Sequence, residues 1–451
     1  MQKTTQCVHT GTRKDKATRG LNSPIYPSSS FEYLDATENI YPRYYNTPNQ
    51  RVVVEKLCAL EAAEDGILFS SGMAAISSVM MAFLSSGDHA VIQRDIYGGT
   101  HHFITADFDR FRIEHTFVAN RPEDIAAAVR PNTKLIYIES PSNPLLLITD
   151  IAAVAKIGRD RHIVTAIDNT FASPVNQNPV PLGIDVVVHS ATKYLGGHSD
   201  LCCGAAVGRA APIRRVKEAA VNLGGSMNAL ACHLLERSLK TLSVRVERQN
   251  ANAMAIAEFL ARHPAVRRVN YPGLETHPGY AVARKQMWGF GGMMSFEVDE
   301  RRISADRFLR RLQLVAPALS LGGVETIICA PSATSHVKLA PAERAELGIT
   351  DGLLRLSVGI EDADDIIADL AQALDDGRRP ARPPSRPARE GSPEQEGEER
   401  PGGQDDADDP AAGSREGRRT ARDELRRGRL PAAGGGRPRP RRPGLRRRRS
   451  G

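Results

Sequence analysis

The chain has 451 residues, of which 41% are hydrophobic and 25% charged, and its formal net charge at pH 7 is +7. This length supplies enough apolar residues for two or three folded domains. No window approaches the ~20 apolar residues of a transmembrane helix, and the polar first residues lack the apolar core of a secretory signal, so we expect a soluble, cytoplasmic protein without membrane partners.

The positive charge is concentrated at the C-terminal end. After Gly377 the chain has 21 arginines, no lysine and 12 acidic residues, whereas the preceding part has 39 basic and 41 acidic residues. Without aromatic, valine or isoleucine residues, this end cannot bury enough apolar surface to offset the entropy of ordering it. We expect 378–451 to be a disordered tail rich in Arg, Pro and Gly. Nucleic-acid binding is a disfavoured alternative, because acidic residues interrupt the arginines and no aromatic side chain can stack on bases.

The cysteines show neither a C-x-x-C pair nor the histidine spacing of a zinc site. They are Cys7, Cys58, Cys202, Cys203, Cys232 and Cys329. We therefore expect reduced thiols and no bound metal. The adjacent Cys202 and Cys203 are interpreted as small apolar filling.

The body of the chain alternates short apolar runs with helical stretches. Residues 1–50 lack clear periodicity and are expected to form an arm that contacts a neighbouring subunit. Strands are expected at 66–69, 90–93, 134–138, 163–167 and 183–188. Because strands that alternate with helices form βαβ units, residues 51–245 are predicted to form an α/β domain around a mostly parallel sheet.

A smaller α/β domain is expected over 246–377. One long helix is predicted at 229–262, and the boundary between the two domains falls within it. Strands follow at 293–298 and 353–358. A closing helix carries Ile366, Ile367, Leu370 and Leu374 on one face.

Lys193 follows the strand expected at 183–188, at the strand's carboxyl end, where open α/β sheets bind ligands. The neighbouring Ser190 and Thr192 supply hydroxyl donors for a phosphate, and a desolvated lysine amine is the nucleophile that a Schiff base requires. Taken alone, this motif is equally compatible with a solvated surface lysine.

Other strand ends carry residues that fit one cofactor, pyridoxal 5'-phosphate (PLP). Asp168 can pair with a protonated pyridine nitrogen. The backbone N–H groups of Gly72 and Met73, at a helix N-terminus, suit the phosphate. Tyr97 offers an aromatic face for the ring and a phenol for proton transfer.

Four of these residues have alternative structural interpretations. Asp168 is also compatible with a helix N-cap, and Gly98-Gly99 with a plain turn. An arginine within a strand, such as Arg355, is equally compatible with an exposed position.

In this pattern the chain resembles the Cys/Met-metabolism family of PLP-dependent enzymes, which includes cystathionine γ-synthase, cystathionine γ-lyase and methionine γ-lyase. The resemblance extends over about residues 5–377. It rests, in order, on SSGMAAI (70–76), DIYGGT (95–100), ESPSNP (139–144), DNTF (168–171), HSATKYLGGHSD (189–200), SLGGVET (320–326) and LLRLSVGIED (353–362). It implies the PLP-dependent transferase fold (fold type I), with a large α/β domain and a smaller C-terminal α/β domain.

The resemblance also implies roles at individual positions. Lys193 resembles the Schiff-base lysine, Asp168 the pyridinium partner and Tyr97 the stacking tyrosine. The implied phosphate cradle consists of Gly72, Met73, Ser190 and Thr192.

Further positions are implied to bind a neighbouring subunit and the substrate. Tyr41 and Arg43 resemble a pair that reaches the phosphate of a neighbouring subunit, which implies a homo-oligomer, at least a dimer and by expectation a tetramer. Arg355, with Asn143 and Ser320, resembles the group that holds the substrate α-carboxylate, which an arginine fork binds in bidentate fashion.

The reaction implied is PLP-dependent γ-elimination or γ-replacement on an amino acid with a γ-leaving group, most commonly the sulfur of transsulfuration. Lys193 is expected to remove the α proton and Tyr97 to assist proton transfer at the leaving group. Glu325 resembles the γ-acting branch of the family, but no individual role can be assigned to His198, Glu325 or His336.

Departures from the family pattern leave the substrate open. His101-His102 follows Thr100 where some members have an arginine for a distal carboxylate, which weakens the case for cystathionine or O-succinylhomoserine. Gly99 stands where methionine γ-lyases tend to have cysteine. Methionine γ-lyase or O-acetylhomoserine sulfhydrylase activity, elimination of a non-sulfur group, and a non-catalytic descendant are the alternatives.

Overall fold

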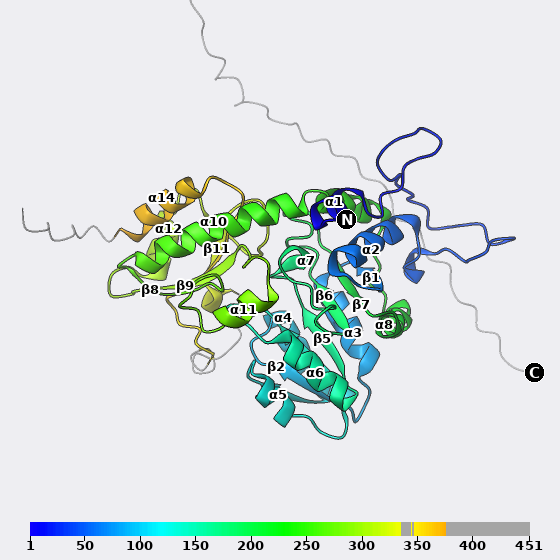
Figure 1. Cartoon of the computed structure of the whole chain (residues 1–451), viewed down its shortest axis with the longest axis horizontal. Helices are drawn as coiled ribbons and strands as arrows, with labels where there is room; N and C mark the ends of the chain where they lie inside the picture. The colour runs from blue at the N-terminus through cyan, green and yellow to red at the C-terminus, as the bar shows by residue number, and fades with distance from the viewer. Residues whose placement is uncertain (335–343, 345–346, 376–451) are drawn as a thin grey trace, which may run out of the picture. The chain divides into compact units, whose positions relative to one another are not determined.

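The computed structural model describes residues 1–334, 344 and 347–375 (Figure 1). The tail predicted at 378–451 and His336 lie outside these residues. In the described part of the chain, no helix is long and apolar enough to cross a membrane.

A seven-stranded sheet lies at the centre of the N-terminal part. Its strand order is β1-β7-β6-β5-β4-β2-β3. The strands are β1 (Asp65–Phe69), β2 (His89–Gln93), β3 (Glu114–Val118), β4 (Thr133–Glu139), β5 (Val164–Asp168), β6 (Val186–His189) and β7 (Gly204–Gly208). The run from β3 to β6 is parallel, and β7 pairs antiparallel with both β6 and β1. The predicted mostly parallel sheet is confirmed.

Two layers of helices cover the sheet, because alternate residues of each strand point to opposite faces. On β4, Leu135 and Tyr137 pack with α3, α4 and α8, whereas Ile136 and Ile138 pack with α2, α5 and α6. The helices are α2 (Pro48–Glu61), α3 (Gly72–Phe83), α4 (Gly98–Phe111), α5 (Pro122–Ala127), α6 (Ile151–Arg161) and α8 (Ala210–Leu223). The short α7 (Ser173–Asn176) follows β5.

The N-terminal arm contains more helix than its sequence suggested. Residues 1–50 were expected to lack periodic structure, but the structure has a helix there, α1 (Lys3–His9). Its Cys7 is fully buried in the core of the large sheet. The arm also contains the 3-10 turn η1 (Pro42–Tyr44). Between these two elements the chain extends away from the helices (Figure 1).

A second sheet forms the C-terminal part of the described chain, with the order β10-β11-β12-β9-β8. Its strands are β8 (Val266–Asn270), β9 (Met293–Val298), β10 (Ala316–Pro317), β11 (Ile327–Cys329) and β12 (Leu353–Ser357). Its helices are α11 (Tyr280–Gln286), α12 (Ala305–Arg311) and α14 (Ala363–Leu374), and a 3-10 turn, η2, spans Pro331–Ala333. The strands β8, β9, β11 and β12 share an apolar core with α14 and one face of α10.

The prediction of one long helix at 229–262 is wrong. The structure has α9 (Ala229–Leu239) and α10 (Leu242–Arg262), with a break at 240–241. At the break, the Ser238 carbonyl accepts a 3.0 Å hydrogen bond from the Arg245 guanidinium, which also donates to the Tyr194 carbonyl at 2.8 Å. The break thereby ties α10 to the turn that follows β6. The domain boundaries at 50, 245 and 377 stay a prediction.

Candidate active site

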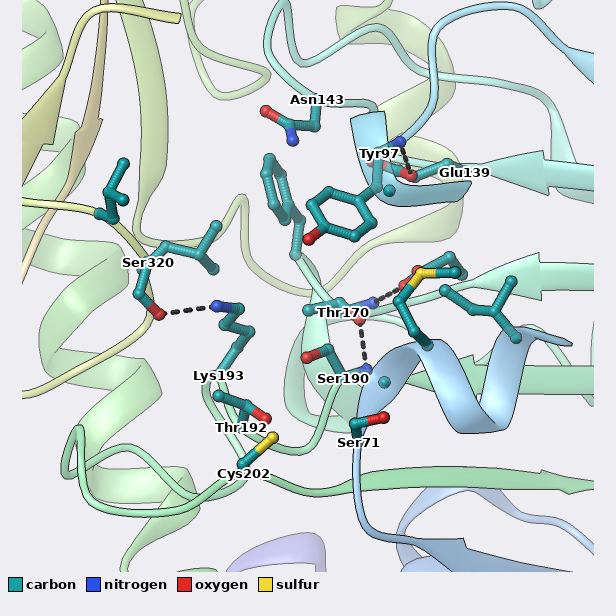
Figure 2. A pocket seen from close by; sticks show the side chains of 18 of the residues that line it. Ser71, Tyr97, Glu139, Asn143, Thr170, Ser190, Thr192, Lys193, Cys202 and Ser320 are labelled. Atoms are coloured by element: carbon teal, nitrogen blue, oxygen red, sulfur yellow. Dashed lines mark hydrogen bonds between the residues drawn. The ribbon is translucent and has the colours of Figure 1, made fainter. Parts of the chain in front are cut away.

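The carboxyl ends of several strands of the large sheet open on one pocket with a volume of about 440 Å³ (Figure 2). It brings together most of the residues that the sequence singled out from separate motifs. Those that line it are Gly72, Met73, Tyr97, Asn143, Asp168, Ser190, Thr192, Lys193, Ser320 and Arg355.

The first turn of α3 forms one end of the pocket. Ser71 caps this helix, and its hydroxyl accepts a hydrogen bond from the Ala74 N–H group at 3.0 Å. A Cβ atom at Gly72 would lie 2.8 Å from Cβ of Ser190, so only glycine allows the helix and the turn after β6 to approach so closely. Because a helix N-terminus presents unpaired N–H groups, this end is suited to an anion.

Two hydroxyl groups from the turn after β6 lie beside that helix end. The Ser190 N–H group donates to the Thr170 hydroxyl at 2.8 Å, which fixes the start of the turn. The Thr192 hydroxyl is held by the backbone of Cys203, donating to its carbonyl at 3.1 Å and accepting from its N–H group at 2.9 Å. Thr192 therefore fixes the turn as well as lining the pocket.

Asp168 ends β5 and is buried, and it pairs in register with Glu139 on β4. Its Oδ1 atom accepts a 2.9 Å hydrogen bond from the Thr170 N–H group, a contact within the turn after β5. The helix N-cap interpretation is wrong, because the N-cap of α7 is Ala172. Burial raises the pKa of Asp168 above its usual value, although the hydrogen bonds from Thr170 partly offset the effect. An ionised Asp168 at this position needs a positive partner.

Tyr97 lies at the start of α4, with 44% of its surface exposed. Its N–H group donates a 2.8 Å hydrogen bond to Oε2 of Glu139 (Figure 2). A Cβ atom at Gly99 would lie 2.4 Å from the Tyr97 ring, so this glycine makes room for the ring. Gly98 and Gly99 begin α4, so their interpretation as a plain turn is wrong. Glu139 has no assigned role in the sequence analysis. Burial and the neighbouring Asp168 raise its pKa well above the usual range, which favours the neutral acid.

Lys193 is half-buried, and its Nζ atom donates a 2.6 Å hydrogen bond to Oγ of Ser320 (Figure 2). Burial lowers the pKa of Lys193, and the positive charge of Arg355 lowers it further. Both causes make the unprotonated, nucleophilic amine easier to form. Ser320 has φ of +84°, a left-handed conformation that is unusual for serine and that turns the residue toward the lysine.

Arg355 is buried in the middle of β12, so the interpretation as an exposed strand residue is wrong. Its Nη1 atom donates to Oδ1 of Asn143 at 2.9 Å, and its Nη2 atom donates to the Ser320 carbonyl at 3.1 Å. Residues from three distant motifs thereby hold a planar cation at the pocket wall, where it can bind a carboxylate.

Tyr41 and Arg43 do not line this pocket. Arg43 donates a 2.7 Å hydrogen bond to the Val221 carbonyl and lies over the rings of Tyr41 and Tyr44. Tyr41 keeps 43% of its surface exposed. Their contact with the phosphate of another subunit stays a prediction.

Other residues of the matching motifs have local contacts. Ser199 donates to Glu325 at 3.3 Å, and Nδ1 of His198 lies 2.7 Å from the Gly196 carbonyl. Cys203 is buried as interpreted, but Cys202 is exposed and lines the pocket, so it is not filling.

The donors in the pocket fit PLP. A helix N-terminus with two neighbouring hydroxyls suits the phosphate, a desolvated amine suits the aldehyde, and a buried carboxylate suits the ring nitrogen. Because Gly72 has no side chain, Ser190 lies against this helix end, and both residues line the pocket. These features come from α3, β5, β6 and the turn after β6, and their convergence needs the folded sheet.

Comparison with known proteins agrees with this chemistry. The family described as "Cys/Met metabolism PLP-dependent enzyme" matches residues 4–375. A cystathionine gamma-lyase of Bacillus subtilis (strain 168) is 45% identical over 380 residues, which are 83% of this chain and 100% of the relative. The cystathionine beta-lyase MetC of the same strain is 43% identical over 377 residues, which are 82% of this chain and 95% of the relative.

A solved structure has the same fold. The crystal structure of cystathionine gamma-lyase from Lactobacillus plantarum complexed with L-serine matches with a TM-score of 0.80 and 39% sequence identity, covering 83% of this chain and 98% of that one. The similarity therefore extends over nearly the whole length of the relatives and includes every strand that builds the pocket.

Proposed function

Because the chain belongs to the Cys/Met metabolism family of PLP-dependent enzymes, we propose that it catalyses γ-elimination on a sulfur amino acid, with L-cystathionine as the substrate. The chain is a PLP-dependent enzyme of sulfur amino acid metabolism, with γ-elimination or γ-replacement as its reaction. The substrate, and elimination rather than replacement, are the parts that we propose.

One observation carries the proposal: Lys193 and Arg355 both donate to Ser320, the first to its hydroxyl and the second to its carbonyl. A substrate α-carboxylate bound by Arg355 therefore lies close to the lysine amine. This arrangement orients the α-carbon of an amino acid toward the base that removes its proton.

Bound PLP supplies an electron-withdrawing ring that makes the α proton acidic. Lys193 would hold the cofactor, Asp168 its ring nitrogen, and the start of α3 with Ser190 and Thr192 its phosphate. Tyr97 would stack on the ring from the opposite side of the pocket.

Proton transfer is assigned to Lys193 and Tyr97. The lowered pKa of Lys193 favours an amine that accepts the α proton at neutral pH and returns it to a neighbouring carbon. The phenol of Tyr97, on the far side of the pocket from Ser320 (Figure 2), is the candidate donor to the departing sulfur.

The proposed enzyme is a cytoplasmic homo-oligomer, with a tetramer built from dimers. Tyr41 and Arg43 lie outside the chain's own pocket and remain accessible at the surface. This exposure supports the proposal that they bind the phosphate of a second subunit's PLP.

The test is product analysis on the purified chain loaded with PLP. γ-Elimination converts L-cystathionine and water to cysteine, 2-oxobutanoate and ammonia, whereas β-elimination gives homocysteine, pyruvate and ammonia. The proposal expects 2-oxobutanoate and cysteine in equal amounts. Pyruvate as the main keto acid, or no turnover, contradicts it.

Methionine is the second candidate substrate, on the basis of charge. Among the described residues, Lys193 and Arg355 are the cationic side chains that line the pocket, and neither His101 nor His102 does so. Methionine has no distal carboxylate that would need a further cation. A kcat/KM for L-methionine that exceeds the value for L-cystathionine, with methanethiol as product, decides for this alternative.

A further inference from the structure

Glu139 is a buried residue of the pocket that has no part in the proposed reaction so far. It ends β4 and lines the pocket, with 4% of its surface exposed. Its Oε2 atom accepts the 2.8 Å hydrogen bond from the Tyr97 N–H group, and the Tyr97 ring extends from this contact into the pocket (Figure 2). The contact therefore joins the end of a core strand to the residue that is proposed to stack on PLP.

The backbone of Glu139 is held in place by a second strand end. Gln93, the last residue of β2, donates from Nε2 to the Glu139 carbonyl at 2.9 Å and accepts from the Glu139 N–H group at 3.3 Å. The same Nε2 atom donates to the carbonyl of Asp95 at 3.1 Å, two residues before Tyr97. Gln93 thereby fixes Glu139 relative to the segment that carries Tyr97, so the Glu139 carboxyl meets that segment from a defined position.

Few other polar contacts set the position of Tyr97. Its side chain is exposed, and among the described residues its hydroxyl group has no hydrogen-bond partner. Its carbonyl accepts from the His101 N–H group at 3.0 Å, in the first turn of α4. The ring is attached to this backbone through a single side-chain bond, so its place over the pocket follows from the place of the backbone. The bond to Glu139 fixes the one remaining polar backbone group, the Tyr97 N–H.

A second route from Glu139 to the cofactor would run through Asp168. The two residues pair in register on neighbouring parallel strands, so their side chains lie on the same face of the sheet. The Oδ1 atom of Asp168, however, accepts from the Thr170 N–H group, whereas Oε2 of Glu139 accepts from Tyr97. The direct hydrogen bond favours the route through Tyr97. The two routes differ in one measurable respect, since only one of them requires the Tyr97 ring.

We propose that Glu139 is a positioning residue that holds the Tyr97 ring over the PLP ring through its hydrogen bond to the Tyr97 N–H group. The inference rests on the proposed stacking role of Tyr97. It gives the end of β4 a part in cofactor binding without direct contact between Glu139 and the cofactor. A purely structural Glu139 would stabilise the strand end and would not act on PLP through Tyr97.

A double-mutant cycle on the Kd for PLP tests this route. Tyr97→Ala should raise the Kd about 3- to 10-fold, the loss expected for one aromatic stacking contact. Glu139→Leu keeps a similar volume and removes the acceptor, and it should raise the Kd about 3-fold in the wild-type background. In the Tyr97→Ala background it should have no further effect, because no ring is left to position. An equal increase in both backgrounds means that Glu139 acts through Asp168 or the fold, and overturns the proposal.

Glu139→Gln is the matched control, because glutamine retains a side-chain oxygen that accepts from the Tyr97 N–H group. Its Kd for PLP should stay close to the wild-type value. The circular dichroism of the visible PLP band should also match the wild type, whereas Glu139→Leu should weaken this band by freeing the neighbouring aromatic ring. A glutamine variant that behaves like the leucine variant shows that the acid itself is required, and this result overturns the proposal.

A change at the donor gives a test that leaves Glu139 intact. Replacing Tyr97 by its α-hydroxy acid analogue puts an ester oxygen in place of the N–H group and keeps the ring. This protein should show the same increase in Kd as Glu139→Leu, and combining the two changes should add nothing. An unchanged Kd in the ester protein overturns the proposal. Should Glu139→Leu fail to fold, the ester protein decides.

Tyr97→Ala separates the inference from the role on which it rests. If this variant leaves both the Kd and the dichroism unchanged, the stacking role of Tyr97 is wrong, and the part assigned to Glu139 is wrong with it. If Tyr97→Ala raises the Kd and Glu139→Leu does not, the role of Tyr97 stands and only the part of Glu139 is overturned. The proposed γ-elimination is judged separately, by its keto acid product.

Discussion

The Nζ atom of Lys193 donates a 2.6 Å hydrogen bond to Oγ of Ser320, joining the turn after β6 to the segment that leads into β11. The two residues are 127 positions apart in sequence, and Ser320 reaches the lysine from a left-handed backbone conformation. The contact connects the proposed cofactor-binding part of the site to the proposed substrate-binding part, since the carbonyl of the same serine accepts from Arg355.

Lys193→Ala should abolish the covalent attachment of PLP. The wild-type protein is expected to be yellow, with a visible absorption band that borohydride removes, and the variant should lose this band and essentially all turnover. Lys156→Ala, at an exposed lysine on α6, is the control and should retain both. Wild-type activity in Lys193→Ala would falsify the central assignment.

Arg355→Lys should raise KM for the amino acid substrate about 10- to 100-fold, with a smaller effect on kcat. Lysine keeps the charge but loses the planar fork that now donates to Asn143 and Ser320, and hydrogen bonds to charged groups contribute about 1.5–3 kcal/mol each. The measurement is steady-state kinetics with a titration of PLP in parallel. An unchanged KM, or a loss confined to PLP binding, is incompatible with a carboxylate-binding role.

Glu139→Gln should change how stability depends on pH. Burial raises the pKa of Glu139 in the folded state above its value in the unfolded chain. Below the unfolded pKa, both states contain the neutral acid and the fold keeps its full stability. As pH rises from the unfolded pKa toward the folded pKa, the unfolded chain ionises first, and the folded state loses stability relative to it. Glutamine does not titrate, and its side-chain oxygen can still accept from the Tyr97 N–H group. The Tm of the variant minus that of the wild type should therefore increase between pH 5 and pH 8. A difference that stays constant or falls over this range would argue that Glu139 is ionised in the fold.

Much of the site could be predicted because it sits at strand ends. The ends of β4, β5 and β6 converge in any parallel sheet, and Asp168 and Lys193 were predicted for that reason. Asn143 was predicted only through the family resemblance. The strand β7 was not predicted, because its sequence GAAVG lacks large apolar side chains. The structure shows the reason: a Cβ atom at Gly204 would lie 2.2 Å from the Ser71 carbonyl, so the strand next to α3 must be built from small residues.

Pairs that depend on distant contacts could not be found by local pattern. The side chains of Glu61 and His189 lie 2.6 Å apart in the core, but the two residues are 128 positions apart in sequence, and each alone is compatible with an ordinary surface position. The break before α10 is likewise accompanied by a distant contact, the hydrogen bond from Arg245 to the Tyr194 carbonyl. Helical periodicity in the sequence cannot predict such a contact.

Arg43 lies in the arm before α2, where its guanidinium donates to the Val221 carbonyl and stacks over two tyrosine rings. In the described part of the chain, no carboxylate forms an ion pair with it. If its anion is the phosphate of a neighbour's PLP, cofactor affinity and oligomerisation are linked. Arg43→Ala should then weaken PLP retention and favour smaller species on dilution, and excess PLP should restore the larger one.

Mixing Arg43→Ala with Lys193→Ala subunits tests the geometry of this contact. If Arg43 completes the neighbour's site, each arm contributes its Arg43 to the pocket of the other subunit. A mixed dimer then has one site with both substitutions and one site with neither. Activity should therefore recover toward half of the wild-type value per mixed dimer, although each variant alone is impaired. Mixing Lys156→Ala with Lys193→Ala subunits gives the reference for a pair in which only one subunit is defective. If subunit exchange is confirmed by mass and activity does not recover, Arg43 acts within its own subunit or outside any site.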